Sequence, residues 1–200
     1  DQNFKSVKDL IQKLVDITSK GGNFLLNIGP KADGTFPQES IDRLKAIGNW
    51  MNVNGESIYG SSASPFEHIE WGRVTQQREG DKTFLYLHVF DWPADGTLKL
   101  EGIGSKPQYI YTLAAKEWLG FISDGNTVSI QLPARSPEAI SPVIVVEIQG
   151  QPLVYKMPVI TSYSTEFITA AEATIALPGA EKRLELRYTS DGTEPRLICP

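Results

Sequence analysis

The sequence predicts a parallel α/β segment with an incomplete sheet, followed by an antiparallel β-sandwich or barrel and by part of a further β module. Three observations support this assignment. Residues 24–28 form a near-continuous apolar run between two helical patterns. Residues 73–148 contain short strand patterns separated by turn residues, without helical stretches. Residues 149–152 (Gln-Gly-Gln-Pro) mark a boundary, after which few strand patterns remain.

The first helical pattern begins at Ser6. This residue can cap a helix, and Asp9, three residues later, brings the sequence close to a capping box. Gly21 and Gly22 end the pattern. The apolar residues between these limits share one helical face: Val7, Leu10, Ile11, Leu14 and Ile17.

The apolar run at 24–28 predicts a buried strand. Its residues do not alternate between apolar and polar, which is typical of a parallel strand covered on both faces. A buried strand needs neighbours for its backbone N–H and C=O groups. Because no second parallel strand is recognisable nearby, we expect the partner strands to lie outside this chain.

A second helical pattern follows a polar turn. Thr35, with Gln38 three residues later and Pro37 in the first turn, predicts its start. Asn54 and Gly55 predict its end. Its buried stripe is expected to consist of Ile41, Leu44, Ile47 and Met51.

The β region follows a linker at 61–65. Regular spacing of short strands with few helical stretches favours an antiparallel sandwich or barrel. After residue 152 there are too few strand patterns to close a second sandwich. The predicted strands are 73–77, 83–90, 97–100, 108–113, 119–123, 127–132 and 142–148, then 158–161, 166–168, 173–177 and 184–189.

Composition excludes several classes of function. A net charge of -5 argues against a nucleic-acid or anionic-membrane surface. Cys199 is the single cysteine and the histidines are His68 and His88, so we expect no internal disulfide, no metal site and no cofactor. No apolar run approaches the ~20 residues of a membrane helix. The N-terminal residues show no signal peptide.

Asn27 is the candidate site residue of the α/β segment. Functional groups of a parallel strand gather at its C-terminal end, which here is 27–31. Asn27 could therefore bond a sugar hydroxyl or a catalytic carboxylate. The alternative is that it satisfies a neighbouring strand's backbone. Lys31 and Asp33 are read as solvated loop residues, with an active-site rim as the alternative.

The tryptophans supply the second candidate. Trp92 follows a predicted strand and is the one expected to be most exposed, so it could stack on a sugar ring. Trp50 and Tyr59 are expected at a seam between domains. No acidic residue lies at a strand end, so no catalytic carboxylate pair is nominated. No Ser-His-Asp arrangement is present either.

Four segments carry a resemblance to a known family. Residues 14–34 (LVDITSKGGNFLLNIGPKADG) resemble the last barrel strand of the α-L-fucosidases, glycoside hydrolase family 29. Residues 50–60 resemble the helix and exit that follow this strand, and 85–93 resemble the C-terminal β-sandwich. Residues 187–195 resemble an accessory β module found on many sugar hydrolases.

The resemblance implies three domains: residues 1–62, the C-terminal end of a (β/α)8-type barrel; 63–150, a β-sandwich; and 151–200, the start of a chitobiase- or fibronectin-III-like sandwich. It implies a retaining exo-hydrolase of terminal α-L-fucose, acting outside the cytoplasm on fucosylated glycans. The family's nucleophile, acid/base and sugar-binding histidines lie upstream, so no catalytic residue maps onto this chain, which alone should be inactive. The alternatives are a non-catalytic carbohydrate-binding or adhesion module and a structural β appendage.

Overall fold

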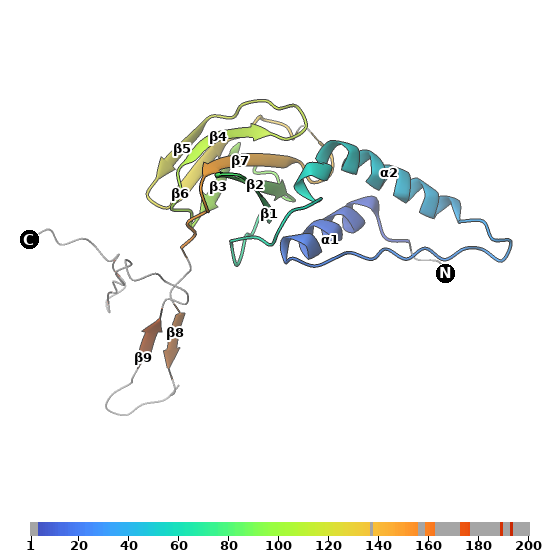
Figure 1. The fold of residues 1–200 in the computed structure, drawn as a ribbon, viewed down its shortest axis with the longest axis horizontal. Coiled ribbons are helices and arrows are strands. Elements are labelled where there is room, and N and C mark those ends of the chain that lie inside the picture. Colours follow the sequence, from blue (N-terminus) through green and yellow to red (C-terminus); the bar gives the residue numbers. More distant parts are fainter. Residues whose placement is uncertain are drawn as a thin grey trace, which may run out of the picture. The chain divides into compact units, whose positions relative to one another are not determined.

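The computed structural model describes residues 4–136, 138–155, 159–162 and 173–176, together with Thr189 and Thr193. Figure 1 shows the elements along the chain. The chain divides into two units, Asp1–Val154 and Tyr155–Pro200. The domain limits expected after residues 62 and 150 stay predictions. Within the described part, no helix is long and apolar enough to cross a membrane.

Helix α1 (Val7–Ser19) begins with the expected capping interactions. The Asp9 N–H donates to the Ser6 hydroxyl at 3.0 Å, and the Ser6 N–H donates to the Asp9 carboxylate at 3.3 Å. After the helix, Gly21 has a φ of +77°, a conformation that glycine adopts without steric cost. The chain leaves α1 at this residue.

Helix α2 (Gln38–Asn54) continues into the short 3-10 helix η1 (Gly55–Ser57). The predicted cap at Thr35 is wrong: Pro37 occupies the N-cap position, because the Thr35 hydroxyl donates to Asp33 at 2.7 Å within the preceding turn. The predicted stripe is also incomplete, since Leu44 is 42% exposed. Only the C-terminal part of α2 reaches the β layers, and its buried residues are Trp50 and Asn54.

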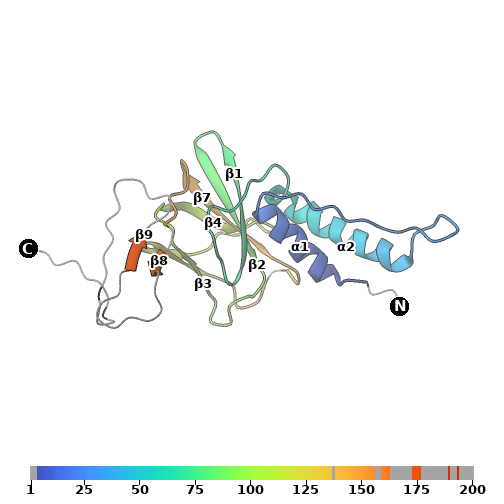
Figure 2. The same cartoon turned by 90° about the horizontal axis from the view of Figure 1, so that it is seen from below.

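The segment at 24–28, predicted as a strand, pairs with no strand in the part of the chain that the structure describes. It lies in an extended stretch between α1 and the loop before α2, running alongside the helices in Figure 2. A β-strand requires a hydrogen-bonded neighbour, and the described chain offers none at this position. Exposure alternates along it, and Leu25 is 91% exposed. The expectation that neither side is exposed is therefore wrong within this chain.

All seven strands predicted between 73 and 148 are present, with small shifts at their ends. The four-stranded sheet has the order β1 (Gly72–Glu79), β2 (Lys82–Val89), β7 (Val143–Gln149), β4 (Pro107–Thr112). The three-stranded sheet has the order β3 (Thr97–Glu101), β6 (Thr127–Gln131), β5 (Phe121–Asp124). Every pairing is antiparallel. We call these seven strands the two-sheet region.

The four-stranded sheet is buried on both faces. On one face, Leu85, Leu87 and Val146 pack with Leu100 and Ile130 of the other sheet in a shared hydrophobic core. The opposite face packs against the helices through a second core cluster. This cluster consists of Ile11, Val15, Trp50, Tyr86, Leu113, Val143 and Val145. Since both faces are covered, six of the seven β7 residues are buried.

In the second unit, β8 (Val159–Ser162) pairs antiparallel with β9 (Ala173–Ala176). These strands correspond to the predicted ones at 158–161 and 173–177. The predicted strands at 166–168 and 184–189 lie outside the described residues, apart from Thr189.

Candidate functional site

Asn27 lies on the exposed side of the extended segment. Side chains alternate along extended backbone, so Asn27 shares a side with Asn23 and Leu25, while Phe24 and Ile28 are half-buried. Asn27 makes no hydrogen bond to the rest of the described chain. The amide is therefore available to groups that this part of the chain does not contain.

The loop after this segment is a self-contained turn. The Lys31 N–H donates to the Thr35 carbonyl at 2.7 Å, and the Gly34 N–H donates to the Lys31 carbonyl at 2.9 Å. The Asp33 carboxylate accepts from the Thr35 hydroxyl and N–H. These hydrogen bonds, led by that of the hydroxyl, lower the pKa of Asp33. Asp33 thus stabilises the turn in its charged form.

Trp92, the second predicted residue, is half-buried rather than prominently exposed. Its indole N–H donates to the Pro133 carbonyl at 3.2 Å, and the ring packs against the core of the two-sheet region. It also lines a cavity of about 350 Å³. The other lining residues are Lys8, Val89, Phe90, Ser136, Glu138, Ala139, Ser141 and Pro142.

The expectation that Trp92 would be the most exposed tryptophan is wrong. Trp118 is 66% exposed and lies between two tyrosine rings, 5.1 Å from Tyr109 and 5.5 Å from Tyr111 between ring centroids. The Trp92 ring is covered because Pro133 and the core approach it from distant parts of the sequence. Local spacing carries no sign of either contact.

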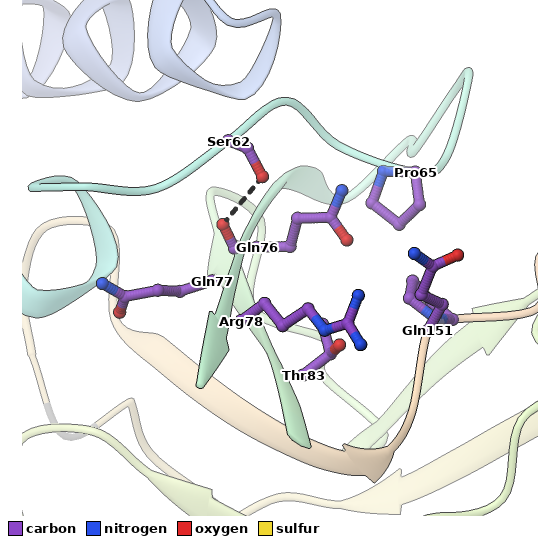
Figure 3. Close-up of a pocket in the computed structure, with 8 residues that line it drawn as sticks. Ser62, Pro65, Gln76, Gln77, Arg78, Thr83 and Gln151 are labelled. Carbon is purple, nitrogen blue, oxygen red and sulfur yellow. Dashed lines mark hydrogen bonds between the residues drawn. The ribbon is translucent and has the colours of Figure 1, made fainter. Parts of the chain in front are cut away.

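A second cavity, of about 370 Å³, opens beside the β1–β2 hairpin (Figure 3). The ends of the Gln76, Arg78 and Gln151 side chains point toward a common space, whereas Gln77 points away. Arg78 uses its Nε to donate to the Gly80 carbonyl at 3.2 Å, which leaves its terminal nitrogens available. The walls combine two prolines with several polar side chains and one cation, so the cavity can bond hydroxyl or carboxylate oxygens.

A buried polar network joins η1 to the four-stranded sheet. The Thr75 hydroxyl donates to the Ser57 carbonyl at 2.6 Å, so it accepts from His88 Nε2, at 3.2 Å. This assigns the proton of the neutral imidazole to Nε2. Burial lowers the pKa of His88 to about 3. His88 is enclosed within a strand, as expected, and its role there is structural.

Trp50, expected at a seam between domains, connects α2 to the loop before β7. Its indole N–H donates to the carbonyls of Ile140 at 3.0 Å and Ser141 at 3.3 Å. Tyr59, expected at the same seam, is instead 69% exposed. Because α2 and the sheet belong to one compact unit, Asp1–Val154, the seam between domains stays a prediction for Trp50.

Among the described residues, no group of three or more His, Cys, Asp or Glu side chains could hold a metal ion. The acidic residues that form ion pairs serve the fold: Asp16 pairs with Arg73, Glu147 with Lys82 and Glu56 with Lys116. The assignment of catalysis to residues outside this chain stays a prediction.

Comparison with known proteins gives consistent similarities. Residues 1–56 match the family model described as alpha-L-fucosidase. The chain is 33% identical to an alpha-L-fucosidase of Dictyostelium discoideum over 153 residues, which is 72% of this chain and 32% of that protein. It is 34% identical to human tissue alpha-L-fucosidase over 139 residues, which is 66% of this chain and 28% of that protein.

Solved structures agree with these sequence relatives. The alpha-L-fucosidase isoenzyme 1 of Paenibacillus thiaminolyticus matches with a TM-score of 0.67 and 33% identity, covering 74% of this chain and 36% of that chain. An alpha-L-fucosidase of Bacteroides thetaiotaomicron matches with a TM-score of 0.67 and 27% identity, covering 74% of this chain and 33% of that chain. The chain thus spans about a third of the length of the relatives it matches.

Proposed function

This chain belongs to the α-L-fucosidase family, and we propose that it contributes the last α-β-α segment of a (β/α)8-type catalytic barrel. On this proposal the two-sheet region is a β-sandwich appended to the barrel, and residues 151–200 begin an accessory sandwich. The parent protein is a retaining exo-α-L-fucosidase that removes terminal α-L-fucose from fucosylated glycans. It acts outside the cytoplasm, in a periplasmic, secreted or lysosomal setting.

The extended segment between α1 and α2 is the observation that supports this proposal best. It carries an apolar sequence, yet it pairs with none of the described strands and leaves Leu25 91% exposed. Backbone N–H and C=O groups of an apolar segment are normally paired, so the unpaired backbone indicates a missing neighbour more strongly than the exposed Leu25 does. Pairing with parallel strands of an upstream barrel would satisfy the backbone and cover Leu25. The segment also lies inside the residues that match the family.

The chemistry of the parent follows from the proposed retention of configuration at the anomeric carbon. A carboxylate attacks the anomeric carbon and forms a covalent fucosyl intermediate, while a carboxylic acid about 5 Å away protonates the leaving oxygen. We assign neither role to this chain. Its contribution is to close the barrel and to place Asn27 at the C-terminal end of the final strand, where it can bond a sugar hydroxyl or a catalytic carboxylate.

Hydrolysis of an aryl α-L-fucoside tests the proposal. We expect the full-length parent to release the aryl alcohol with retention at the anomeric carbon, and residues 1–200 alone to show no turnover. Turnover by the 200-residue chain at the parental rate would reject the assignment of both carboxyls to the rest of the parent. Absence of any fucosidase activity in a folded parent would reject the function itself.

A further inference from the structure

The cavity beside Trp92 lies where α1, the end of β2 and the loop before β7 come together. Trp92, Phe90 and Val89 supply apolar surface, and Lys8, Glu138 and Ser141 supply polar groups. Its volume of about 350 Å³ falls within the ~300–1000 Å³ typical of small-molecule sites. One or two sugar rings are of this size.

Ser141 is the unusual member of this lining. It is only 4% exposed, and its hydroxyl has no hydrogen-bond partner within the described chain. Its φ of +43° also places a non-glycine residue in the left-handed region. Leaving a buried hydroxyl unpaired is unfavourable, and strained backbone is concentrated at ligand sites. Both features occur in one residue of the cavity lining, and a bound ligand that the hydroxyl rotates to reach would supply its missing partner.

Glu138 and Lys8 give the cavity one acidic and one basic group. Asn54 donates to the Glu138 carboxylate at 3.1 Å, which holds that side chain in place from the buried side. Burial raises the pKa of the Glu138 carboxyl, although the Asn54 hydrogen bond acts in the opposite direction. Lys8, at the start of α1, forms no ion pair within the described residues. With one charge of each sign, the lining matches an uncharged ligand better than a nucleotide or another polyanion.

The aromatic wall has a fixed orientation. The Trp92 indole N–H donates to the Pro133 carbonyl at 3.2 Å, and this hydrogen bond fixes the position of the ring edge. The ring surface can then pack against the C–H groups of a sugar, while hydroxyl and carboxylate groups bond the sugar hydroxyls. An apolar surface with a few placed polar groups is the usual make-up of a specific small-molecule site.

We propose that the cavity lined by Trp92, Glu138 and Ser141 is a secondary binding site for an uncharged sugar residue of a glycan. The site lies within the Asp1–Val154 unit and is separate from the extended segment that carries Asn27. The choice of a glycan rests on the proposed function, because glycans are the molecules that a fucosidase meets.

Saturation-transfer NMR on the full-length parent tests this site. The probes are three neutral disaccharides without fucose: lactose, cellobiose and N,N′-diacetylchitobiose. We expect saturable binding of at least one of them. Ser141→Ala should weaken that binding about tenfold, because the ligand loses one buried hydrogen bond. The same change should not destabilise the protein, since the hydroxyl bonds to nothing in the described chain. A purely structural Ser141 would leave binding unchanged.

Two further variants keep the test decisive. Ser141→Gly relieves the positive φ and removes the hydroxyl, so it should fold at least as well as the wild type and still lose binding. Trp118→Ala is the matched control, because Trp118 is exposed and lies outside the cavity. Binding should survive this change and fall with Trp92→Ala.

The outcomes separate this proposal from the proposed function. No saturable binding of any of the three disaccharides, or equal binding by wild type and both Ser141 variants, overturns the secondary site. Loss of binding with Trp118→Ala would place the sugar elsewhere and also overturn it. Hydrolysis of the aryl α-L-fucoside, measured on the same samples, reports on the proposed function alone. Both Ser141 variants should retain it.

Discussion

The guanidinium of Arg73 on β1 donates to the carboxylate of Asp16 on α1, with 2.6 Å between Nε and Oδ1. Asp16 also accepts from Lys20 at 2.8 Å. The two partners come from different layers, so Asp16 connects the helix to the four-stranded sheet at a partly buried position. Stability should therefore depend on the charge of this one carboxylate.

Asp16→Asn should lower the free energy of unfolding by about 1 kcal/mol at pH 7. Burial acts to raise the pKa of Asp16, but hydrogen bonds from Lys20 and Arg73 prevail and lower it. A lowered pKa in the folded state gives stability that is present above the unfolded value, about 3.9, and is lost as the pH falls below it. In urea unfolding, the difference in free energy of unfolding between wild type and variant should be smaller at pH 3 than at pH 7. An equal difference at both pH values would contradict this assignment.

His88 should make the protein less stable in mild acid. Its pKa is about 3 in the folded state and about 6.5 when unfolded, so between these values only the unfolded chain binds the proton. Stability should then fall with decreasing pH, by at most about 1.4 kcal/mol per pH unit. His88→Gln should flatten this dependence between pH 7 and 5. His68→Gln, at an exposed position, is the control and should leave it unchanged.

Trp50→Phe should lower the free energy of unfolding by about 1–2 kcal/mol, because the Ile140 and Ser141 carbonyls lose their indole donor. The change also removes the five-membered ring from a buried site, so the measured loss combines the missing hydrogen bonds with a small cavity. Trp118→Phe at the exposed position should have almost no effect. Equal unfolding midpoints for the two variants would mean that the Trp50 hydrogen bonds contribute little.

Gly72→Ala should disrupt the end of the β1–β2 pair. A Cβ at Gly72 would lie 1.9 Å from the His88 carbonyl oxygen, a contact that only backbone movement can relieve. We expect a loss of at least about 2 kcal/mol in thermal or urea unfolding. Gly80→Ala has no neighbour within 4 Å, so it tests only the cost of a positive φ. A Gly72 variant as stable as the wild type would show that the strand ends adjust freely.

Leu25→Asp in the full-length parent should abolish most fucosidase activity and reduce the yield of folded protein. The charge would enter the parallel sheet that we propose, and burying a carboxylate without a partner is strongly unfavourable. Ile122→Asp on β5 is the control, since Ile122 is 64% exposed and lies in the two-sheet region. Full activity with Leu25→Asp would remove the main support for the barrel assignment.

Asn27→Ala is the milder companion of this variant. It should weaken activity or stability of the parent, depending on whether the amide bonds the sugar or the backbone. If both were unchanged, Asn27 would have neither role.

The β region was predictable because its signals are local. Short runs of apolar and β-branched residues between turn residues mark the strands, and β1 to β7 follow these runs closely. The start of α2 was predicted too early because the Thr35 hydroxyl could either cap the helix or donate to Asp33. In the structure it donates to Asp33, and the turn forms in place of the cap. The sequence alone does not indicate whether the helix cap or the turn forms.

The candidate site was much less predictable. Lys8, Trp92 and the loop that carries Glu138 and Ser141 reach one cavity from three separate parts of the chain, and no motif connects them. The left-handed backbone at Ser141 and the missing partner of its hydroxyl depend on packing around it. Trp92 was predicted as a site residue from its position after a strand and from an expected high exposure. The structure supports it for a different reason, since the half-buried ring lines the cavity.

Strand β7 has one consequence for how this protein can be probed. Ile144, Val146 and Ile148 face the core between the sheets, whereas Val143 and Val145 face the helices. Methyl labels on adjacent residues of a single strand would therefore report separately on the two layers. Detachment of the helices alone would change the spectra of the odd-numbered positions and leave the even-numbered ones in place.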